Sequence, residues 1–74
     1  MLSVELAKCI AMERYMRFLG SMEIMRSLRQ TVVTWMDWGG TVCVIFLRVA
    51  DGYASRVVCL VNRATGRVCM HVRG

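Results

Sequence analysis

Cys59, Cys69 and His71 are the residues whose types and spacing come nearest to a chemical site in this sequence. The strand register derived below places Cys59 opposite His71 and diagonal to Cys69 on one face of a sheet. Thiolate and imidazole groups at such separations can bind zinc, and a Cys–His pair can act as a nucleophile with its base. A fourth ligand would have to come from a second chain, and no acidic residue stands nearby to orient the histidine. We therefore interpret the three as two buried thiols and a histidine at a sheet edge, and we predict no metal, cofactor or catalytic residue.

Other motifs that carry catalysis are missing from the sequence. It has no paired carboxylates, no phosphate-binding glycine loop and no nucleophile elbow. Asp51-Gly52 and Gly39-Gly40 are typical of hairpin turns, so they need no ligand to explain them. We predict that the protein is not an enzyme.

Cysteine usage indicates a reducing compartment. Glu5 and Lys8 interrupt the apolar N-terminal run, so this run does not resemble a signal peptide. We expect free thiols that serve as small core residues in a cytoplasmic protein. No CxxC pair and no zinc-ribbon spacing occurs among the four cysteines, which are Cys9, Cys43, Cys59 and Cys69.

The chain is basic, with ten basic against five acidic residues and a net charge of +5. Nine of the ten basic residues are arginines, and Lys8 is the exception. Arginine binds phosphate and carboxylate groups bidentately, which suits nucleic acid or an acidic protein surface; GC-rich coding would produce the same bias. Candidate residues for nucleic-acid contact recur along the helical half, at Arg14, Arg17, Arg26 and Arg29.

The chain is also more apolar than one small core requires. Of its 74 residues, 57% are hydrophobic and 20% are charged, and the mean hydropathy is +0.48. A domain this short is only marginally able to bury a core, while disorder requires a much lower hydrophobic fraction. We predict a single domain over 1–74 that forms a homodimer or higher oligomer, binds another protein, or both. We expect no membrane segment, because Asp37 and Gly39-Gly40 interrupt the longest apolar stretch.

The order of elements predicts an α+β fold. Residues 2–19 are typical of a helix, and Ser21 and Glu23 favour the start of a short second helix over 22–30. From Thr31 onward the composition becomes that of strands. We expect an N-terminal helix or helical hairpin, over about 2–30, packed on a four-stranded antiparallel meander. The strands are expected at about 31–38, 41–49, 54–63 and 67–73.

Three turns predict the register of this meander. Residue 38 should face 41 across Gly39-Gly40, and residue 50 should face 53 across Asp51-Gly52. In the last hairpin, with Gly66 at positive φ, residue 63 is predicted to face 67. Both faces of the sheet are then apolar, whereas a sheet with one solvated face alternates with polar residues. We expect the helices to cover one face and a partner to cover the other.

The composition of the two faces predicts which one is the core. The face expected to form the core carries Val32, Thr34, Met36, Trp38, Cys43, Ile45, Leu47, Val58, Leu60, Val68, Met70 and Val72. The other face combines apolar side chains with a histidine and a rim of arginines, which is typical of an interface. Its predicted partner-binding residues are Trp35, Val44, Phe46, Val57, His71, Arg48, Arg63, Arg67 and Arg73. As an alternative, the two helices separate and cover both faces.

Part of the chain resembles a known family. Helices are followed by strands that end in Gly52-Tyr53, Arg56-Val57-Val58 and His71-Val72-Arg73. This order is similar to the C-terminal half of the RelE/ParE toxin superfamily, and the resemblance covers the last third of the chain. It implies a basic antiparallel sheet and, in some members, cleavage of ribosome-bound mRNA. The strand that precedes the helical hairpin in that family is missing here, and no catalytic residue is carried over.

Three functional hypotheses follow from these features. The first is a small non-enzymatic protein-interaction module, an inhibitor or adaptor of the kind carried by phages and mobile elements. The alternative is a basic regulator that binds nucleic acid, with an affinity that weakens steeply as salt is added. The third is an RNA-directed toxin like those of the resembled family.

Overall fold

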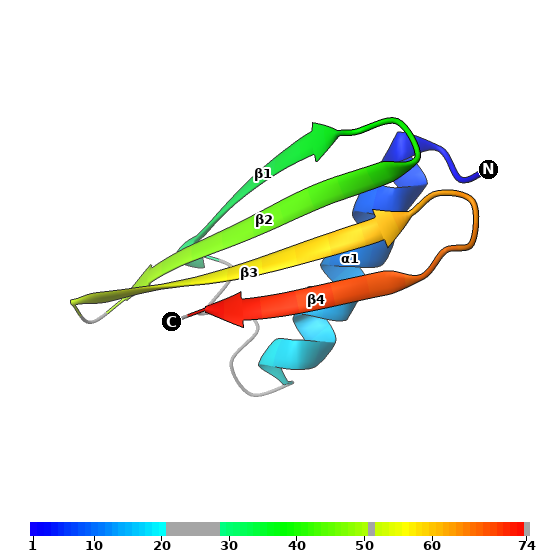
Figure 1. The fold of residues 1–74 in the computed structure, drawn as a ribbon. Helices are drawn as coiled ribbons and strands as arrows, with labels where there is room; N and C mark the ends of the chain where they lie inside the picture. The colour runs from blue at the N-terminus through cyan, green and yellow to red at the C-terminus, as the bar shows by residue number, and fades with distance from the viewer. Residues whose placement is uncertain (21–28, 51, 74) are drawn as a thin grey trace.

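One helix packs across one face of a four-stranded antiparallel sheet (Figure 1). The computed structural model describes residues 1–20, 29–50 and 52–73. The strands lie in the order of the sequence, each beside the next. The elements are α1 (Val4–Leu19), β1 (Thr31–Asp37), β2 (Thr41–Ala50), β3 (Tyr53–Asn62) and β4 (Val68–Arg73).

The predicted α+β fold and its meander are confirmed. Each strand begins and ends within one residue of its predicted bounds. The predicted second helix over 22–30 falls mainly on 21–28, which lies outside the described residues. In the part of the chain that the structure describes, no helix is both long enough and apolar enough to cross a membrane.

The ends of α1 follow from the residues that flank it. Ser3 is the N-cap, and its side-chain oxygen accepts a hydrogen bond of 3.1 Å from the Leu6 N–H, which satisfies one of the free donors at the helix start. Glu5 in the first turn and Arg17 in the last turn complement the helix dipole. The helix ends at Gly20, whose φ of 81° favours glycine.

The core lies between α1 and the two central strands. The small side chains of Ala7 and Ala11 are buried and let the helix approach the sheet closely. Tyr15 stacks on Phe46, with ring centroids 4.1 Å apart and planes inclined by 9°. The Tyr15 hydroxyl also lies 3.2 Å from Thr31 Oγ1 at the start of β1. The remaining buried side chains of this cluster are Val42, Val44, Val57, Cys59 and Val61.

Two of the three predicted registers are confirmed. The Trp38 N–H donates to the Thr41 carbonyl across the first turn, and Ala50 lies opposite Tyr53 across the second. The third register is wrong by one residue, because Val61 lies opposite Val68.

Asn62 is the physical reason for the shifted register. Its side-chain oxygen accepts hydrogen bonds from the N–H groups of Ala64 (2.9 Å) and Thr65 (3.2 Å). Its backbone N–H donates to the Arg67 carbonyl, and its backbone carbonyl accepts from Gly66. An asparagine that bonds to the backbone ahead of it starts a turn. The β3–β4 turn therefore begins at Asn62, one residue earlier than predicted.

This one-residue shift exchanges the two faces of β4, since the side-chain period of a strand is two. Val68 and Met70 join the side that packs against α1, where they are partly buried. Cys69, His71 and Arg73 move to the opposite side. The face with an apolar centre is consequently the one predicted to bind a partner, and α1 packs on that face.

Arg63 ties the N-terminal segment to two turns of the sheet. Its Nε donates to the Leu2 carbonyl at 2.7 Å, and its Nη1 donates to the Gly39 carbonyl at 2.9 Å. Its own backbone donates to Gly40 and accepts from the Leu2 N–H. The Asp37 carboxylate lies 3.9 Å from its Nη1. Arg63, predicted to lie at the rim of an interface, is instead a structural residue of the fold.

We expect Asn62→Ala to lower the free energy of unfolding by about 1–2 kcal/mol, because two backbone donors lose their acceptor. Asn62→Asp keeps an acceptor at this position, so it should stay close to the parent protein. Urea unfolding followed by circular dichroism measures both. Equal losses in the two variants would show that the side-chain oxygen does not hold the turn.

We expect Phe46→Ala to cost about 3–5 kcal/mol, because it removes the ring beneath Tyr15 and leaves a cavity in the core. A loss of this size is close to the whole stability of a small domain. Thermal unfolding measures it, with the exposed Val49→Ala as the control expected to lie within about 0.5 kcal/mol of the parent. A Phe46→Ala protein that unfolds like the parent would contradict the position of this ring in the core.

Candidate protein-binding surface

Three of the predicted partner-binding residues lie in the core. Val44, Phe46 and Val57 are between 0 and 3% exposed. They face α1 because the β4 register leaves their side of the sheet without a charged residue at its centre. They are therefore not available to a partner, which corrects the prediction.

Two more of these residues lie on the helix-facing side but nearer its margin. Trp35 in β1 stays about half exposed, and the Lys8 ammonium lies 4.1 Å from the centre of its ring. Arg48 in β2 is partly buried, and its Nε has no hydrogen-bond partner among the described residues. Neither residue contributes to a surface shared with His71.

His71 and Arg73 are exposed on the side of the sheet that faces away from α1. Arg67 is exposed at the β3–β4 turn, where its backbone closes the turn. The structure therefore separates the nine predicted residues among the core, the helix-facing margin, a turn and the opposite face.

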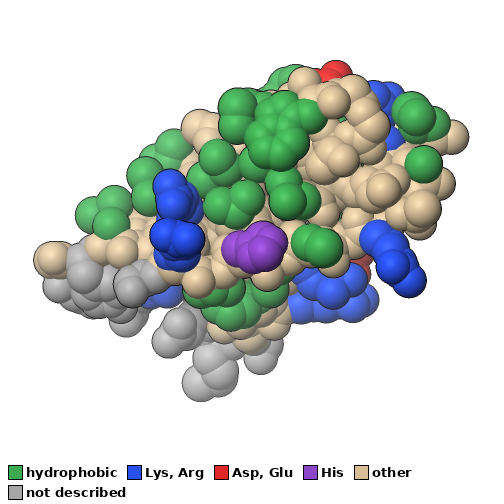
Figure 2. All heavy atoms as spheres, viewed as in Figure 1, with side chains coloured by type: hydrophobic (Ala, Val, Ile, Leu, Met, Phe, Trp, Pro, Cys, Tyr) green, Lys and Arg blue, Asp and Glu red, His purple; other side chains and the backbone are tan. Residues whose placement is uncertain are grey.

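We call the side of the sheet that faces away from α1 the open face, which is the front of the molecule in Figures 1 and 2. Its members follow from the register of the four strands. They are Val32, Thr34, Met36, Trp38, Thr41, Cys43, Ile45, Leu47, Val49, Ala54, Arg56, Val58, Leu60, Asn62, Cys69, His71 and Arg73.

Large hydrophobic side chains lie unprotected on the open face. Exposed fractions run from 40% for Leu47 to 61% for Val32, with Met36, Trp38 and Val49 between them. Figure 2 shows hydrophobic side chains over much of this side of the molecule. An apolar surface of this kind, bordered by polar residues, marks an interaction site.

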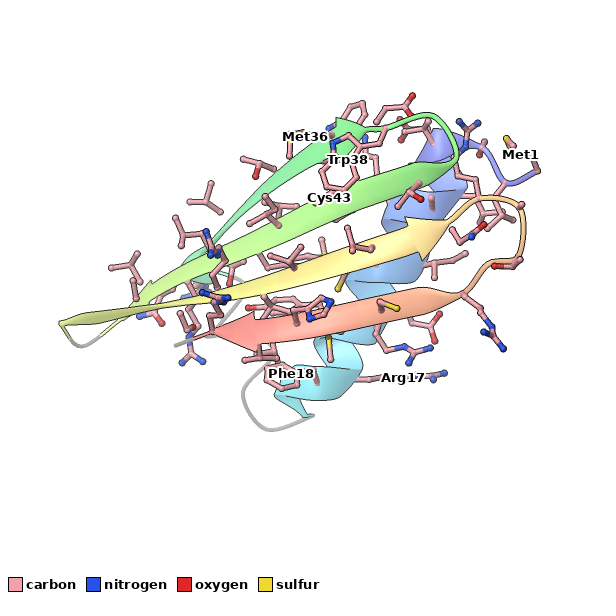
Figure 3. The ribbon with its side chains drawn as sticks, viewed as in Figure 1. Met1, Arg17, Phe18, Met36, Trp38 and Cys43 are labelled. Atoms are coloured by element: carbon pink, nitrogen blue, oxygen red, sulfur yellow. The ribbon has the colours of Figure 1, made fainter. Side chains whose placement is uncertain are left out.

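The end of the open face near the β1–β2 turn is built around a tryptophan. Met36, Trp38 and Cys43 lie together on the front of the sheet (Figure 3). Cys43 is only 2% exposed although α1 lies on the other side of the sheet. The side chains of its own face therefore shield it, and Trp38 is its diagonal neighbour in the register.

The charge of the open face is positive. Arg56 and Arg73 lie directly opposite each other on β3 and β4, and both are exposed. Like charges in this position repel, and neither arginine forms an ion pair with a described residue. His71 lies on the same face, and the described residues of this face include no Asp or Glu. The open face thus offers cations that have no anion of their own.

A shallow hollow of about 410 Å³ lies between these arginines. Leu47, Ala54 and Ser55 complete its lining beside Arg56 and Arg73. Its lining thus combines two apolar residues and a serine with two arginines. It is suited to a carboxylate that is attached to an apolar group.

Cys59, Cys69 and His71, the possible zinc ligands or Cys–His nucleophile in the sequence, do not lie together in the structure. Cys59 is buried on the helix-facing side, whereas Cys69 and His71 are exposed on the open face. Across residues 1–20, 29–50 and 52–73, no group of three metal-ligating side chains is close enough to hold an ion. Burial raises the pKa of the Cys59 thiol; Arg14 lowers this pKa and Cys43 raises it. Burial also raises the pKa of the Cys43 thiol, so both thiols are poor nucleophiles at neutral pH.

The residues predicted for nucleic-acid contact do not join this surface. Arg14 and Arg17 lie on α1, behind the sheet, and Arg17 pairs with Glu13 at 2.7 Å. Arg29 is exposed just before β1, and Arg26 lies outside the described residues. The basic side chains are thus divided between the two layers of the fold.

Four of the five exposed large hydrophobic residues of the open face were expected in the core, namely Val32, Met36, Trp38 and Leu47. The signal that identifies them is Asn62, because an asparagine at the end of a strand favours an early turn. With the register that Asn62 sets, His71 and Arg73 join the face of Arg56. The face with three basic residues is then the better candidate for exposure.

We expect Trp38→Ala to raise the alkylation rate of Cys43 at least about tenfold, because thiol reactivity follows exposure and thiolate fraction. Iodoacetamide labelling followed by mass spectrometry of peptides measures the rate, with the exposed Cys69 as the internal reference. Val49→Ala should leave the Cys43 rate unchanged. If Cys43 of the parent reacts as fast as Cys69, Trp38 does not cover it.

Comparisons with known proteins give no relative of this chain. No family model matches it, no curated protein matches it, and no solved structure matches it. The resemblance of its last third to the RelE/ParE superfamily therefore gains no support from these comparisons.

Proposed function

We propose that the protein is a small non-enzymatic interaction module, an inhibitor or adaptor, that binds an apolar and acidic surface of another protein with its open face. The observation that carries this proposal is the composition of that face. It exposes five large hydrophobic side chains beside two arginines and a histidine, with no acidic residue among those described.

The apolar part of the open face supplies the driving force for binding. Trp38 and Met36 belong to the residue types that are enriched in interfaces, and aromatic side chains in pockets commonly dominate the binding energy. Burying them under a partner removes apolar area from water, at roughly 25 cal/mol for each Å².

The basic part of the open face supports an acidic partner. A carboxylate placed between Arg56 and Arg73 would replace the repulsion of two opposed cations by two charge-assisted hydrogen bonds. Complementary charge of this kind improves selectivity and speeds association.

The open face is large enough for such an interface. A strand of ten residues is about 33 Å long, and four strands span roughly 15 Å. The flat area of the sheet is therefore roughly 500 Å², and projecting side chains make its solvent-accessible area larger. A standard interface buries about 800 Å² of accessible area on each partner. A partner that covers the whole face would approach this standard size.

Nucleic acid fits the same observations less well. Binding to phosphates requires a continuous basic surface, and the arginines here are divided between α1 and the open face. The exposed apolar side chains of β1 and β2 also outnumber the open-face cations. For these reasons we favour a protein partner.

Selection from a random-peptide display library tests the proposal, with the full chain immobilised as the target. We expect enriched peptides to combine Asp or Glu with aromatic or aliphatic residues. Arg73→Glu and Leu47→Asp should each weaken the best peptides at least about tenfold, which corresponds to the loss of one charge-assisted contact or one apolar contact.

Arg14→Glu is the matched control, since it makes the same charge reversal on the other layer and should leave peptide binding unchanged. An absence of enrichment, or equal binding by all variants, would contradict the proposal. A single-stranded RNA oligonucleotide is the second probe. If the RNA binds with a steep salt dependence, and Arg14→Glu weakens it, the nucleic-acid alternative is favoured instead.

A further inference from the structure

β1 exposes large apolar side chains on both of its faces. Val33 and Trp35 point to the helix-facing side, yet they are 41% and 45% exposed. Val32 and Met36 are exposed on the open face. In β4, at the other edge of the sheet, Val68 and Met70 are partly buried against the core, and Val72 near the end of the strand is exposed.

The position of α1 explains this difference. The core side chains that contact the helix come mainly from β2 and β3, and the helix runs diagonally behind the sheet (Figure 1). The Lys8 ammonium of α1 lies over the Trp35 ring, which stays 45% exposed. Val33 and Trp35 of β1 therefore lie beyond the part of the sheet that the helix buries, which is centred on β2 and β3.

The backbone groups at the centre of β1, at Val33 and Trp35, are also unpaired on the side away from β2. Hydrogen-bonded and non-hydrogen-bonded pairs alternate in an antiparallel ladder, and Trp38 and Thr41 form a hydrogen-bonded pair. The N–H and C=O groups of Val33 and Trp35 consequently point away from β2. No described residue bonds to them.

The features that usually prevent edge strands from pairing are missing from β1. Lysine, proline and inward-pointing charges commonly protect an edge, but β1 reads TVVTWMD, with its single charge at the last residue. β4 in contrast carries His71 and Arg73, and Arg67 precedes it. Of the two edges, β1 is the one suited to accept another strand.

We propose that β1 pairs with β1 of a second copy of this chain, antiparallel and centred on Thr34, to form an eight-stranded sheet. Residues whose backbone groups point outward must then face each other, so Val33 lies opposite Trp35 of the second copy. Thr34 lies opposite its own copy, and Val32 lies opposite Met36. Threonine pairs and aromatic–aliphatic pairs both stabilise antiparallel strands, and no like charges meet.

The area available predicts a weak dimer. Half-exposed tryptophans contribute roughly 100 Å² each, and with the valines, Met36 and the strand edge the total is roughly 400 Å² for each copy. This is below the ~800 Å² of a standard interface. We therefore expect the dimer to depend on protein concentration.

The geometry has a consequence for the open face. A two-fold axis perpendicular to the sheet keeps both helices in one layer, so the two open faces become continuous across the β1 seam. This inference is independent of the partner proposed for the open face, because it rests on the edge of β1 and its helix-facing side.

Sedimentation equilibrium of the full chain tests the proposal over about a hundredfold range of concentration, which should span a dissociation constant in the micromolar range. We expect Val33→Lys to abolish the dimer. Val72→Lys is the matched control, since Val72 is a valine in the other edge strand, on the same side of the sheet and 51% exposed. It should leave the dimer intact.

Disulfide trapping tests the register. In a chain with Cys9→Ser and Cys69→Ser, Thr34→Cys should form a disulfide-linked dimer with oxidised glutathione, because the two copies of residue 34 face each other across the axis. Val32→Cys is the control, and it should crosslink far more slowly, since it faces Met36. A chain that is monomeric throughout, a dimer that persists in Val33→Lys, or equal crosslinking at both positions would overturn the proposal. None of these outcomes bears on peptide binding by the open face.

Discussion

The side chain of Asn62 sets the constraint on which the rest of the structure depends. By accepting hydrogen bonds from the two residues at the start of the β3–β4 turn, it fixes where β3 ends. That position fixes the register of β4, and the register decides which side of the sheet receives His71 and Arg73. The side without them carries apolar side chains at its centre, so α1 packs there. The exposed surface of the molecule is thus determined by one turn.

The sequence predicts the elements of this fold well, because each has a local cause. Ser3 and Gly20 bound the helix, and the glycine turns give the first two registers. The choice of the covered face has no local cause of this kind. It depends on comparing the composition of the two whole faces of the sheet. A one-residue error at the β3–β4 turn assigned every residue of β4 to the wrong face. The predicted site was consequently placed on the core, and only His71 and Arg73 among its residues lie on the face now favoured.

The fold also shows why so small a chain leaves apolar surface exposed. A four-stranded sheet has two faces and two edges, and one described helix of 16 residues covers a single face from β2 to β4. Tyr15 and Phe46 anchor that helix over the centre of the sheet. The open face lies outside its reach, and β1 lies at its margin, where Tyr15 contacts Thr31 and Lys8 lies over Trp35. These two surfaces differ in chemistry, since one adds cations to its apolar side chains and the other adds unpaired backbone groups. A module with two such surfaces can join a partner to a second copy of itself, as an adaptor does.

The contacts of Arg63 have a consequence for how the chain folds during its synthesis. Its guanidinium and backbone hold Leu2, a residue 61 positions earlier, and α1 docks on strands that are translated after it. The helix is made before the strands, and half of the strand side chains in its core, Val57, Cys59 and Val61, come from β3. Folding must therefore be completed late and as one cooperative step, because long-range contacts are formed only after the loop between them is closed. A β1–β2 hairpin formed before then would expose apolar side chains on both of its faces, and transient surfaces of that kind are prone to aggregate.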